Sequence, residues 1–405
     1  MSSNTYPIIA VGASIAAISF IRTLRKHNDQ RPVLLIHGED RLPYKRTKIN
    51  KNMVRGFGKD DFKMADPQWY SDQNVTLLYD RVINIDSNER MISTKSGKVF
   101  SYGKLLLATG AISVVPVISG LDSQQIHSVQ NAADVDRVLA ACNNKQRFLI
   151  IGAGVEGIET ADQLVRKGKQ VIVANRMQLP LQKLFPETIT RLLEERMEAH
   201  GVRLFKGVSV NSITEVDGVY HTRLNGENLE FDAVIACTGA LPNVELGRKA
   251  GLKVGQGIIV DEYLQTSDKD ILAAGDVAQH KNGVVTGLWH AAEHQGQLAA
   301  LNLLDKPSAH TLPPFRLKTN VFGLYLFSGG YEAVIPDVDE VQEQRHGNIL
   351  RIMYFSEGKL KAVVFANDGD RAKLYQQALF ERWDKKRVAH ELPLPPKMSF
   401  LFSLS

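Results

Sequence analysis

Two stretches of the sequence share one pattern, in which a short apolar run passes through small residues into a helical segment. The later stretch, FLIIGAGVEGIETA (148–161), has glycine at all three places of the pattern G-x-G-x-x-G, at Gly152, Gly154 and Gly157. Glycine allows a tight turn and a close approach of the backbone to a pyrophosphate, and the N-terminus of the following helix attracts the anion. The stretch therefore predicts a dinucleotide site within a βαβ unit.

The earlier stretch, PIIAVGASIAAISF (7–20), is a weaker copy of this pattern. It keeps Gly12 at the first place and has Ser14 at the second and Ala17 at the third. An ordinary strand-to-helix turn is the alternative interpretation for this copy. Because the pattern occurs twice in one chain, we favour two related dinucleotide-binding domains.

Composition limits the class of protein. The chain has 405 residues, of which 44% are hydrophobic and 23% charged, as is typical of a globular protein with two or three domains. Its only cysteines, Cys142 and Cys237, form no C-x-x-C pair and no cluster with metal-ligand spacing, so we predict neither a disulfide framework nor a metal site. The net charge of +5 suggests nucleic-acid binding only weakly, and the longest apolar window is too short to span a bilayer. We infer a cytoplasmic protein.

Each glycine turn is followed by the same succession of segments. A second buried strand is predicted in RPVLLIHGEDR (31–41), followed by a hairpin and a buried run, Leu105–Leu107. The second module repeats this order in KQVIVANRM (169–177), in a hairpin with an Asn-Gly turn, and in FDAVIACTGALPN (231–243). A further run, Ile271–Ala274, leads into Gly275–Asp276 and a helix. Pro313 and Pro314 suggest a boundary before a smaller domain with antiparallel strands.

These motifs in this order resemble the FAD-dependent pyridine nucleotide-disulfide oxidoreductases, and within them the rubredoxin reductase and ferredoxin reductase branch. The matching motifs are the turn at Gly12, PYKRTKIN, LLLATGA, IGAGVEGIE, CTGALPN and ILAAGDVA. The resemblance implies an α/β fold with two Rossmann-like dinucleotide-binding domains of the three-layer ββα type and a small α+β C-terminal domain. The implied FAD domain, residues 1–112 and 239–311, is interrupted by an NAD(P)H domain at 113–238 and followed by the C-terminal domain at 312–405.

The resemblance also implies the residues that would contact each cofactor. For FAD these are Gly12, Ser14, Ile15, Ala16, Ala17, Glu39, Arg46, Thr109, Gly110, Gly275, Asp276, Trp289 and Lys318. For NAD(P)H they are Gly152, Ala153, Gly154, Val155, Glu156, Gly157, Glu159, Asn175, Arg176, Thr238 and Gly239.

For several of these residues, a second interpretation of their role stays open. Glu39, just past the second strand, is predicted to hold a ribose hydroxyl, with Asp40 in reserve, but a solvated loop acid fits equally well. Asp276 is implied at the ribityl or phosphate region of FAD, and a helix N-cap is compatible with the same geometry. Trp289 is equally compatible with stacking near the isoalloxazine or the nicotinamide and with simple core packing. For His290 and His294 we favour the reading without a catalytic role, since hydride transfer needs no protein acid.

The segment Pro43–Asn50 separates this branch from the relatives that use a thiol. Those relatives carry an active cysteine near here, whereas this chain has Tyr44, Lys45 and Arg46. Arg46 falls on the basic position of the branch, where a fixed cation would stabilise a reduced, anionic flavin. A solvated surface cation is the alternative. Thr47 and Asn50 stand where the branch usually has proline and serine.

The implied activity is that of a FAD-dependent oxidoreductase, in which electrons pass from NAD(P)H through FAD to a small iron-containing carrier, a rubredoxin or a ferredoxin. The flavin would carry the chemistry, and Glu159 would face the nicotinamide side. NADH is expected slightly ahead of NADPH, although Asn175 and Arg176 stand where an acid would select NADH.

A basic segment in the first third of the chain suits an acidic carrier. Its cations are Arg41, Lys45, Arg46, Lys48, Lys51, Arg55, Lys59 and Lys63. A solubilising face is the alternative. Two other functions stay open: a reductase or oxidase with a small-molecule acceptor such as O₂, a quinone or nitrite, and a slowly reacting sensor that binds both cofactors. Monomer and homodimer are both compatible with the sequence.

Overall fold

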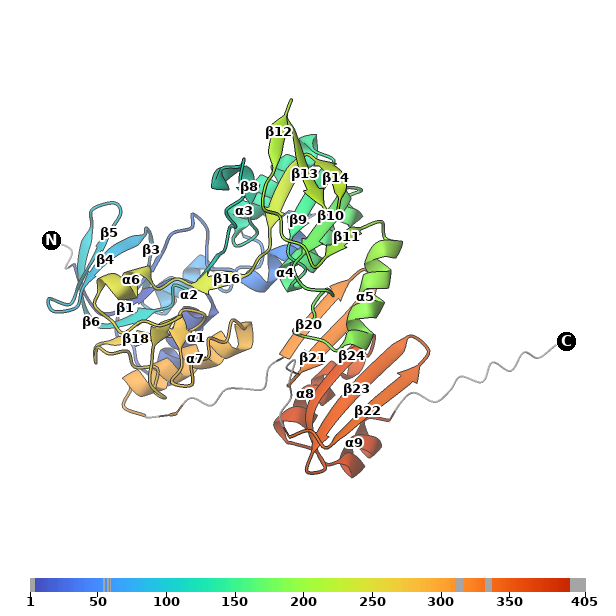
Figure 1. The fold of residues 1–405 in the computed structure, drawn as a ribbon. Coiled ribbons are helices and arrows are strands. Elements are labelled where there is room, and N and C mark those ends of the chain that lie inside the picture. Colours follow the sequence, from blue (N-terminus) through green and yellow to red (C-terminus); the bar gives the residue numbers. More distant parts are fainter. Residues whose placement is uncertain are drawn as a thin grey trace. The chain divides into compact units, whose positions relative to one another are not determined.

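A computed structural model describes residues 4–53, 55–56, 58, 60–306, 308–309, 316–331 and 337–393 (Figure 1). Its contacts divide the chain into two units. The first comprises residues 1–114, 130–136 and 239–312, and the second comprises residues 115–129, 137–238 and 313–405. The predicted boundary at Pro313–Pro314 lies outside the described residues, and the three-domain division stays a prediction.

The first unit is built on a seven-stranded sheet in the order β3-β2-β1-β6-β5-β4, with β18 paired to β6. Its parallel strands are β1 (Thr5–Val11), β2 (Val33–His37), β3 (Val75–Tyr79), β6 (Val99–Leu107) and β18 (Ile271–Ala273). Two antiparallel strands, β5 (Met91–Thr94) and β4 (Val82–Asp86), extend it beyond β6. Every residue of β2 and β18 is buried, as expected for parallel strands covered on both faces.

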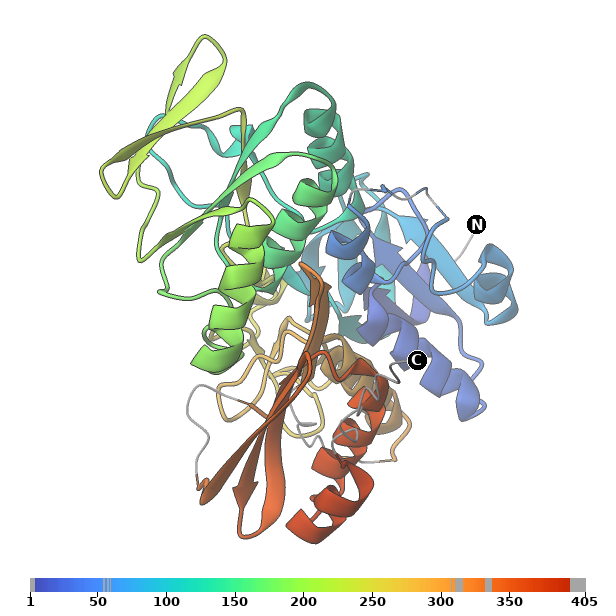
Figure 2. The same ribbon diagram turned by 90° about the vertical axis from the view of Figure 1, so that its right-hand side faces the viewer.

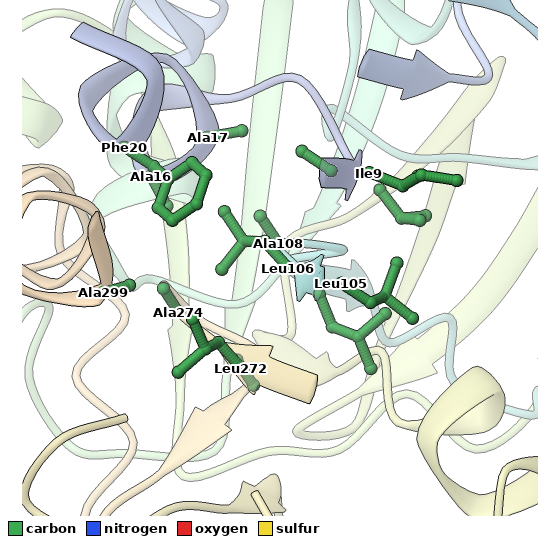
Figure 3. Close-up of a cluster of buried hydrophobic side chains, with 14 of the residues drawn as sticks. Ile9, Ala16, Ala17, Phe20, Leu105, Leu106, Ala108, Leu272, Ala274 and Ala299 are labelled. Atoms are coloured by element: carbon green, nitrogen blue, oxygen red, sulfur yellow. The ribbon is translucent and has the colours of Figure 1, made fainter. Parts of the chain in front are cut away.

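Helices α1 (Ile15–Lys26) and α7 (Trp289–Leu303) pack together against this sheet. Figure 3 shows their side chains meeting those of β1, β6 and β18, among them Phe20, Leu106 and Leu272. Gly296 of α7 allows the two helices to approach closely, because a Cβ added to it would lie 2.1 Å from the carbonyl oxygen of Ala16 in α1. The contact between the two helices therefore depends on a glycine in α7.

The remaining elements of the first unit are short. Two antiparallel strands, β7 (Ala111–Ser113) and β16 (Ala240–Pro242), pair where the chain leaves and re-enters the unit. The others are η1 (Arg46–Lys48), η2 (Asn50–Asn52), α2 (Pro67–Asp72), α6 (Glu245–Lys249), and the parallel pair β17 (Ile258–Ile259) and β19 (Ala278–Gln279). Helix α3 (Ala132–Asn144) begins in the first unit and continues into the second.

The second unit repeats the plan of the first. Its five-stranded parallel sheet has the order β11 (Arg203–Lys206), β10 (Gln170–Asn175), β9 (Arg147–Ile151), β15 (Ala233–Ala236) and β8 (Ile126–His127). Its helices are α4 (Val155–Arg166), α5 (Glu187–Ala199) and η3 (Ser123–Gln125). A separate antiparallel sheet consists of β12 (Thr214–Val216), β13 (Val219–Leu224) and β14 (Glu227–Phe231).

The C-terminal part of the second unit is an antiparallel sheet with helices on one face, as the red end of the chain in Figure 2 shows. The strand order is β20 (Arg316–Val321), β21 (Leu324–Gly329), β24 (Lys359–Ala366), β23 (Ile349–Ser356) and β22 (Glu340–His346). The helical segments are η4 (Gly369–Arg371), α8 (Ala372–Phe380) and α9 (Lys385–Glu391).

The predicted fold class is confirmed by this architecture. The Asn-Gly hairpin is confirmed in detail, since Asn225 and Gly226 both have positive φ, 49° and 83°, as a two-residue turn between twisted strands requires. The sequence did not single out β22 and β23. Within the described ranges, no helix is long and apolar enough to cross a membrane.

The contact between α1 and α7 provides a test of this packing. We expect Gly296→Ala to lower the free energy of unfolding by about 1–3 kcal/mol, because the added methyl group meets backbone atoms that cannot rotate away. Gly58→Ala is the control, since no described residue lies within 4 Å of its added Cβ. Chemical denaturation of both variants measures the difference, and equal stabilities would contradict the close packing.

Candidate functional site

Both glycine turns have the same backbone geometry at their first glycine. Gly12 has φ +97° and an added Cβ would lie 2.2 Å from the carbonyl oxygen of Ala108, while Gly152 has φ +109° and its Cβ would lie 2.2 Å from that of Cys237. The amide N–H of each donates to the second strand, to Ile36 and Ala174 respectively, at 2.8 Å. A side chain is excluded at both positions by conformation and by space.

The space around the second and third positions of the pattern differs in its demands on the side chain, and the two copies differ in sequence at these positions. Ser14 and Gly154 occupy the N-cap positions of α1 and α4, and neither helix has a side-chain capping bond there. A Cβ added to Gly154 would meet no described residue within 4 Å, so the fold itself leaves room for a side chain such as that of Ser14 at the second place. At the third place, the Cβ of a substituted Gly157 would lie 2.0 Å from the Gly152 carbonyl oxygen, whereas the first unit accommodates Ala17. Both helices present uncapped N-termini that suit a pyrophosphate.

The side chains of the first turn point into the core. Ile15, Ala16 and Ala17 are buried, so any contact with FAD would come through their backbone. Trp289 begins α7 and is partly buried against the same core cluster.

The chain returns to this turn at Gly275–Asp276, directly after β18. Gly275 has φ +82°, and its N–H donates to Oε1 of Gln295 at 2.7 Å. Gln295 is fully buried, and its Nε2 lies 3.2 Å from the Thr286 hydroxyl and 3.1 Å from Nε2 of His280. Burial lowers the pKa of His280, so its ring is neutral and can accept this hydrogen bond. Sequence reasoning missed Gln295, because no local pattern identifies a partner twenty residues away.

Asp276 is a half-buried carboxylate without a hydrogen bond or ion pair to any described residue. Burial raises its pKa, against the opposing influence of Arg46. Such a group is costly unless a ligand donates to it. The hydroxyl groups of a ribityl chain have the required chemistry, so the site fits the FAD that the resemblance implies.

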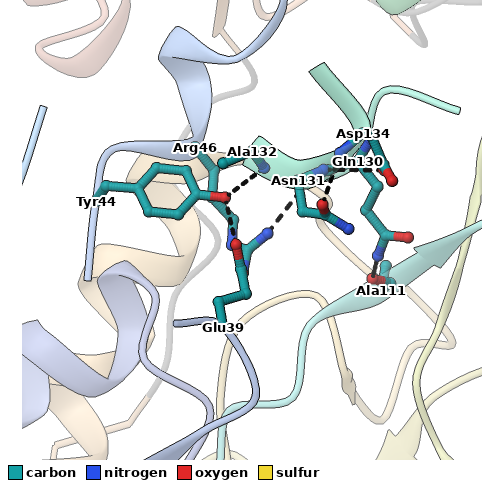
Figure 4. A network of polar contacts seen from close by, with 8 residues as sticks. All are labelled: Glu39, Tyr44, Arg46, Ala111, Gln130, Asn131, Ala132 and Asp134. Carbon is teal, nitrogen blue, oxygen red and sulfur yellow. Dashed lines mark hydrogen bonds and ion pairs between the residues drawn. The ribbon is translucent and has the colours of Figure 1, made fainter. Parts of the chain in front are cut away.

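Glu39 and Arg46 are brought together in the first unit (Figure 4). Glu39 follows β2 by two residues, and its carboxylate accepts from the Tyr44 hydroxyl at 2.8 Å and pairs with Arg46. Arg46 also donates to the carbonyl oxygen of Gln130 at 3.3 Å. Arg46 is therefore an ion-paired cation with a side chain that is 39% exposed, and its place beside the flavin stays a prediction.

Thr109 and Gly110 follow β6 and are tied to the returning chain. The Thr109 hydroxyl donates to the Asn243 carbonyl oxygen at 3.0 Å, and the Asn243 N–H donates to that of Gly110 at 2.8 Å. Lys318, by contrast, is exposed on β20 and belongs to the second unit, unlike the other predicted FAD contacts.

The second unit gathers the predicted NAD(P)H contacts around α4. Val155 and Glu156 lie in the first turn of α4. Thr238 lies beside the glycine turn, since its backbone nitrogen would be 3.5 Å from a Cβ added to Gly152. Gly239 is grouped with the first unit, where its carbonyl oxygen accepts from Val114. Glu159 is buried and accepts a 2.6 Å hydrogen bond from the hydroxyl of Thr319 on β20.

A second contact ties α4 to the C-terminal sheet. The N–H of Phe322 donates to the buried carboxylate of Asp162 at 2.7 Å. Sequence reasoning missed Asp162, which carries no motif of its own.

Asn175 and Arg176, at the end of β10, have different roles. Asn175 is 6% exposed, and its Nδ2 donates to the carbonyl oxygens of Met177 and Leu179 while its Oδ1 lies 3.4 Å from the Ala153 N–H. It holds the loop after β10 against the glycine turn. Arg176 is exposed, and no described residue forms a hydrogen bond or ion pair with it. Of the two, Arg176 is the group available to a ligand.

The basic segment is partly neutralised. Arg41 lies 3.4 Å from Asp136, Arg55 lies 3.8 Å from Asp61, and Lys63 lies 2.8 Å from Asp66. Lys45, Lys48 and Lys51 are exposed. Lys59 lies outside the described residues.

Comparison with known proteins identifies the family. The model of the "Pyridine nucleotide-disulphide oxidoreductase" family matches residues 6–296. The chain belongs to this family. The predicted family is thus confirmed, and with it the oxidoreductase class and the FAD and pyridine nucleotide cofactors at the level of the family.

Individual relatives are more distant. The chain is 28% identical over 394 residues to the assimilatory nitrate reductase electron transfer subunit of Bacillus subtilis, covering 95% of this chain but only 49% of that protein. It is 32% identical over 315 residues to the nitric oxide reductase FlRd-NAD(+) reductase of Aeromonas hydrophila, covering 77% of this chain and 80% of the relative. A ferredoxin reductase from Rhodopseudomonas palustris has the same fold, with a TM-score of 0.85, 24% identity, and coverage of 96% and 97% of the two chains.

Unlike the disulphide reductases for which the family is named, this oxidoreductase has no accessible thiol. Both of its cysteines, Cys142 and Cys237, are free and buried in the second unit, and burial raises the pKa of each thiol. Neither is suited to form the reactive thiolate that disulphide chemistry needs.

The electrostatics of Asp276 lead to a prediction about stability and pH. Because its pKa is raised on folding, the ligand-free protein is destabilised above that pKa and regains stability as the pH falls through it. We expect Asp276→Asn to raise the melting temperature of the FAD-free protein at pH 7 and to weaken FAD binding at least about 10-fold. Thermal melting and FAD titration measure the two effects. The exposed Asp305→Asn is the control, and a lower melting temperature for Asp276→Asn would show a structural role instead.

Arg176 leads to a prediction about the nicotinamide cofactor. A guanidinium group at the end of the second strand suits the 2′-phosphate of NADPH. We expect Arg176→Ala to raise the KM for NADPH about 10-fold, because one charge-assisted contact with the 2′-phosphate is lost. The KM for NADH should change by less than about twofold, because NADH has no 2′-phosphate. Steady-state kinetics with both cofactors measures this, with the exposed Lys183→Ala as control. An equal loss with both cofactors would refute the role.

Proposed function

We propose that this chain is an oxidoreductase that passes electrons from NAD(P)H through FAD to a small iron-containing carrier protein, such as a rubredoxin or a ferredoxin. The observation that carries the proposal is the segment Pro43–Asn50. It supplies Tyr44 and Arg46 to the predicted FAD site and contains no cysteine. Electrons would therefore leave without a thiol intermediate.

The proposed roles divide between the two units. Gly12, Glu39 and Asp276 of the first unit would hold FAD, and the turn Gly152–Gly157 of the second unit would hold the dinucleotide of NAD(P)H. Bound FAD would supply the chemistry, since it accepts a hydride from a nicotinamide and releases electrons singly. The protein would bind and orient the two cofactors and fix the charge of Arg46 beside Asp276.

The names of the relatives support a protein acceptor. One is named an electron transfer subunit, another a FlRd-NAD(+) reductase, and the fold is shared with a ferredoxin reductase. A cytoplasmic location stays a prediction from the sequence.

Exposed lysines of the basic segment would receive the carrier. Lys45, Lys48 and Lys51 lie on or beside the short helices η1 and η2, within eight residues of Tyr44. A carrier with an acidic face would be attracted to them, and such attraction acts mainly on the rate of association.

Charge reversal tests this docking surface. We expect the double variant Lys48→Glu, Lys51→Glu to slow carrier reduction at least about 10-fold at low salt, because the attraction becomes repulsion. Added salt should slow the wild type similarly, since exposed charges are screened beyond about 8 Å at physiological ionic strength. Reduction of ferricyanide by NADH should change much less, because a small acceptor needs no docking surface.

The control variant carries the same change in charge at another place. Lys95→Glu, Lys98→Glu reverses two exposed lysines beside the turn between β5 and β6. If rubredoxin and ferredoxin are reduced as fast by the first variant as by the control, the docking proposal fails. Fast turnover with O₂, a quinone or nitrite would then favour a small-molecule acceptor, and slow turnover with every acceptor would favour a sensor.

A further inference from the structure

Tyr44 contacts both charged residues of the predicted FAD site. Tyr44 is 5% exposed, and the guanidinium carbon of Arg46 lies 5.4 Å from the centroid of its ring. Its hydroxyl donates to Oε2 of Glu39 at 2.8 Å, while Oε1 of Glu39 pairs with Arg46. One aromatic side chain thus contacts both a carboxylate and a cation (Figure 4).

The hydroxyl of Tyr44 is itself held in place from the other side. It accepts a 3.0 Å hydrogen bond from the N–H of Ala132, the first residue of α3. This N–H is one of the donors that a helix leaves unpaired at its N-terminus. With its oxygen engaged by Ala132, the Tyr44 hydroxyl has one hydrogen to give, and the geometry directs it to Glu39.

The start of α3 is anchored in turn. Asp134 is buried, and its carboxylate accepts from the N–H groups of Gln130 and Asn131 at 2.8 and 3.2 Å. The Gln130 side chain accepts from the Ser113 N–H at 3.0 Å and donates to the carbonyl oxygen of Ala111. The Ala132 N–H is therefore a fixed donor rather than a fraying helix end.

This arrangement leaves Glu39 able to bind a ligand. Each oxygen of a carboxylate has two lone pairs, and each oxygen of Glu39 has one partner among the described residues. Its side chain is 26% exposed, so the remaining lone pairs are accessible. A pair of ribose hydroxyls is a ligand of matching chemistry.

We propose that Tyr44 is a positioning residue that orients the Glu39 carboxylate for the adenosine ribose of FAD. The inference rests on the proposed function, because it takes FAD to be the ligand of Glu39. Without the hydroxyl, Glu39 keeps Arg46 alone as a partner within the described part of the chain and is free to rotate toward it. The role of Tyr44 is then exerted through Glu39 and not through direct contact with FAD.

Tyr44→Phe isolates this role, because it removes the hydroxyl and keeps the ring beneath Arg46. We expect the dissociation constant for FAD to rise about 10-fold in the full-length chain, the loss expected for a hydrogen bond to a charged group. The decisive measurement adds Glu39→Ala. If Tyr44 acts through Glu39, the double variant should bind FAD as Glu39→Ala alone does, whereas independent effects would multiply.

Tyr70→Phe is the matched control. Tyr70 is equally buried in the first unit, at 2% exposed, but its hydroxyl has no hydrogen-bond partner among the described residues. Loss of this hydroxyl should leave FAD binding unchanged. Glu39→Asp is a second variant, and it leaves the hydrogen bond between Tyr44 and the Ala132 N–H in place. It keeps the negative charge but draws the carboxylate back from the Tyr44 hydroxyl. We therefore expect it to weaken FAD binding.

The outcomes separate this inference from the proposed function. If the wild type fails to bind FAD, the proposed function is wrong. If the wild type binds FAD but Tyr44→Phe binds it equally well, or if the losses from Tyr44→Phe and Glu39→Ala multiply, Tyr44 does not position Glu39.

Discussion

The close approach between each glycine turn and the strand beside it is the constraint on which the rest of the structure depends. At Gly12 and Gly152 a Cβ would lie 2.2 Å from the carbonyl oxygen of the residue that follows the neighbouring strand, Ala108 after β6 and Cys237 after β15. Only a residue without a side chain permits this contact, which brings the N-terminus of the next helix to the carboxyl edge of the sheet. The repeated geometry explains why two segments, 140 residues apart (152 − 12), predict the same kind of ligand.

Around the first turn, polar groups from separate segments are placed by contacts inside the protein. Gln295 accepts a hydrogen bond from the N–H of Gly275, the residue before Asp276. Tyr44 donates to Glu39 and packs its ring against Arg46. Each of these supporting residues is buried. A buried hydrogen-bonded group has few alternative rotamers, so the charged groups that it supports are ordered before a ligand arrives.

The second unit shows how similar turns acquire different surroundings. Asn175 is used to close the loop after β10, and Glu159 is used to bind Thr319 of the C-terminal sheet. Both were predicted as cofactor contacts on the strength of their place in the motif. Their hydrogen bonds within the protein leave Arg176 as the exposed polar group at the end of the second strand, and this is the physical basis for testing NADPH.

The sequence by itself determined the two dinucleotide turns, the Asn-Gly hairpin, the buried parallel strands and the family, because each depends on residues close together in the chain. The tertiary structure alone decided the partners of the charged groups. The hydrogen bond between Thr319 and Glu159 joins residues 160 apart, and that between Ala132 and Tyr44 joins residues 88 apart. Such contacts have no local pattern, since they depend on how separate elements pack. For that reason Arg46 and Glu39 could be proposed from motifs, whereas Tyr44, Gln295 and Asp162 acquired their roles only in the folded chain.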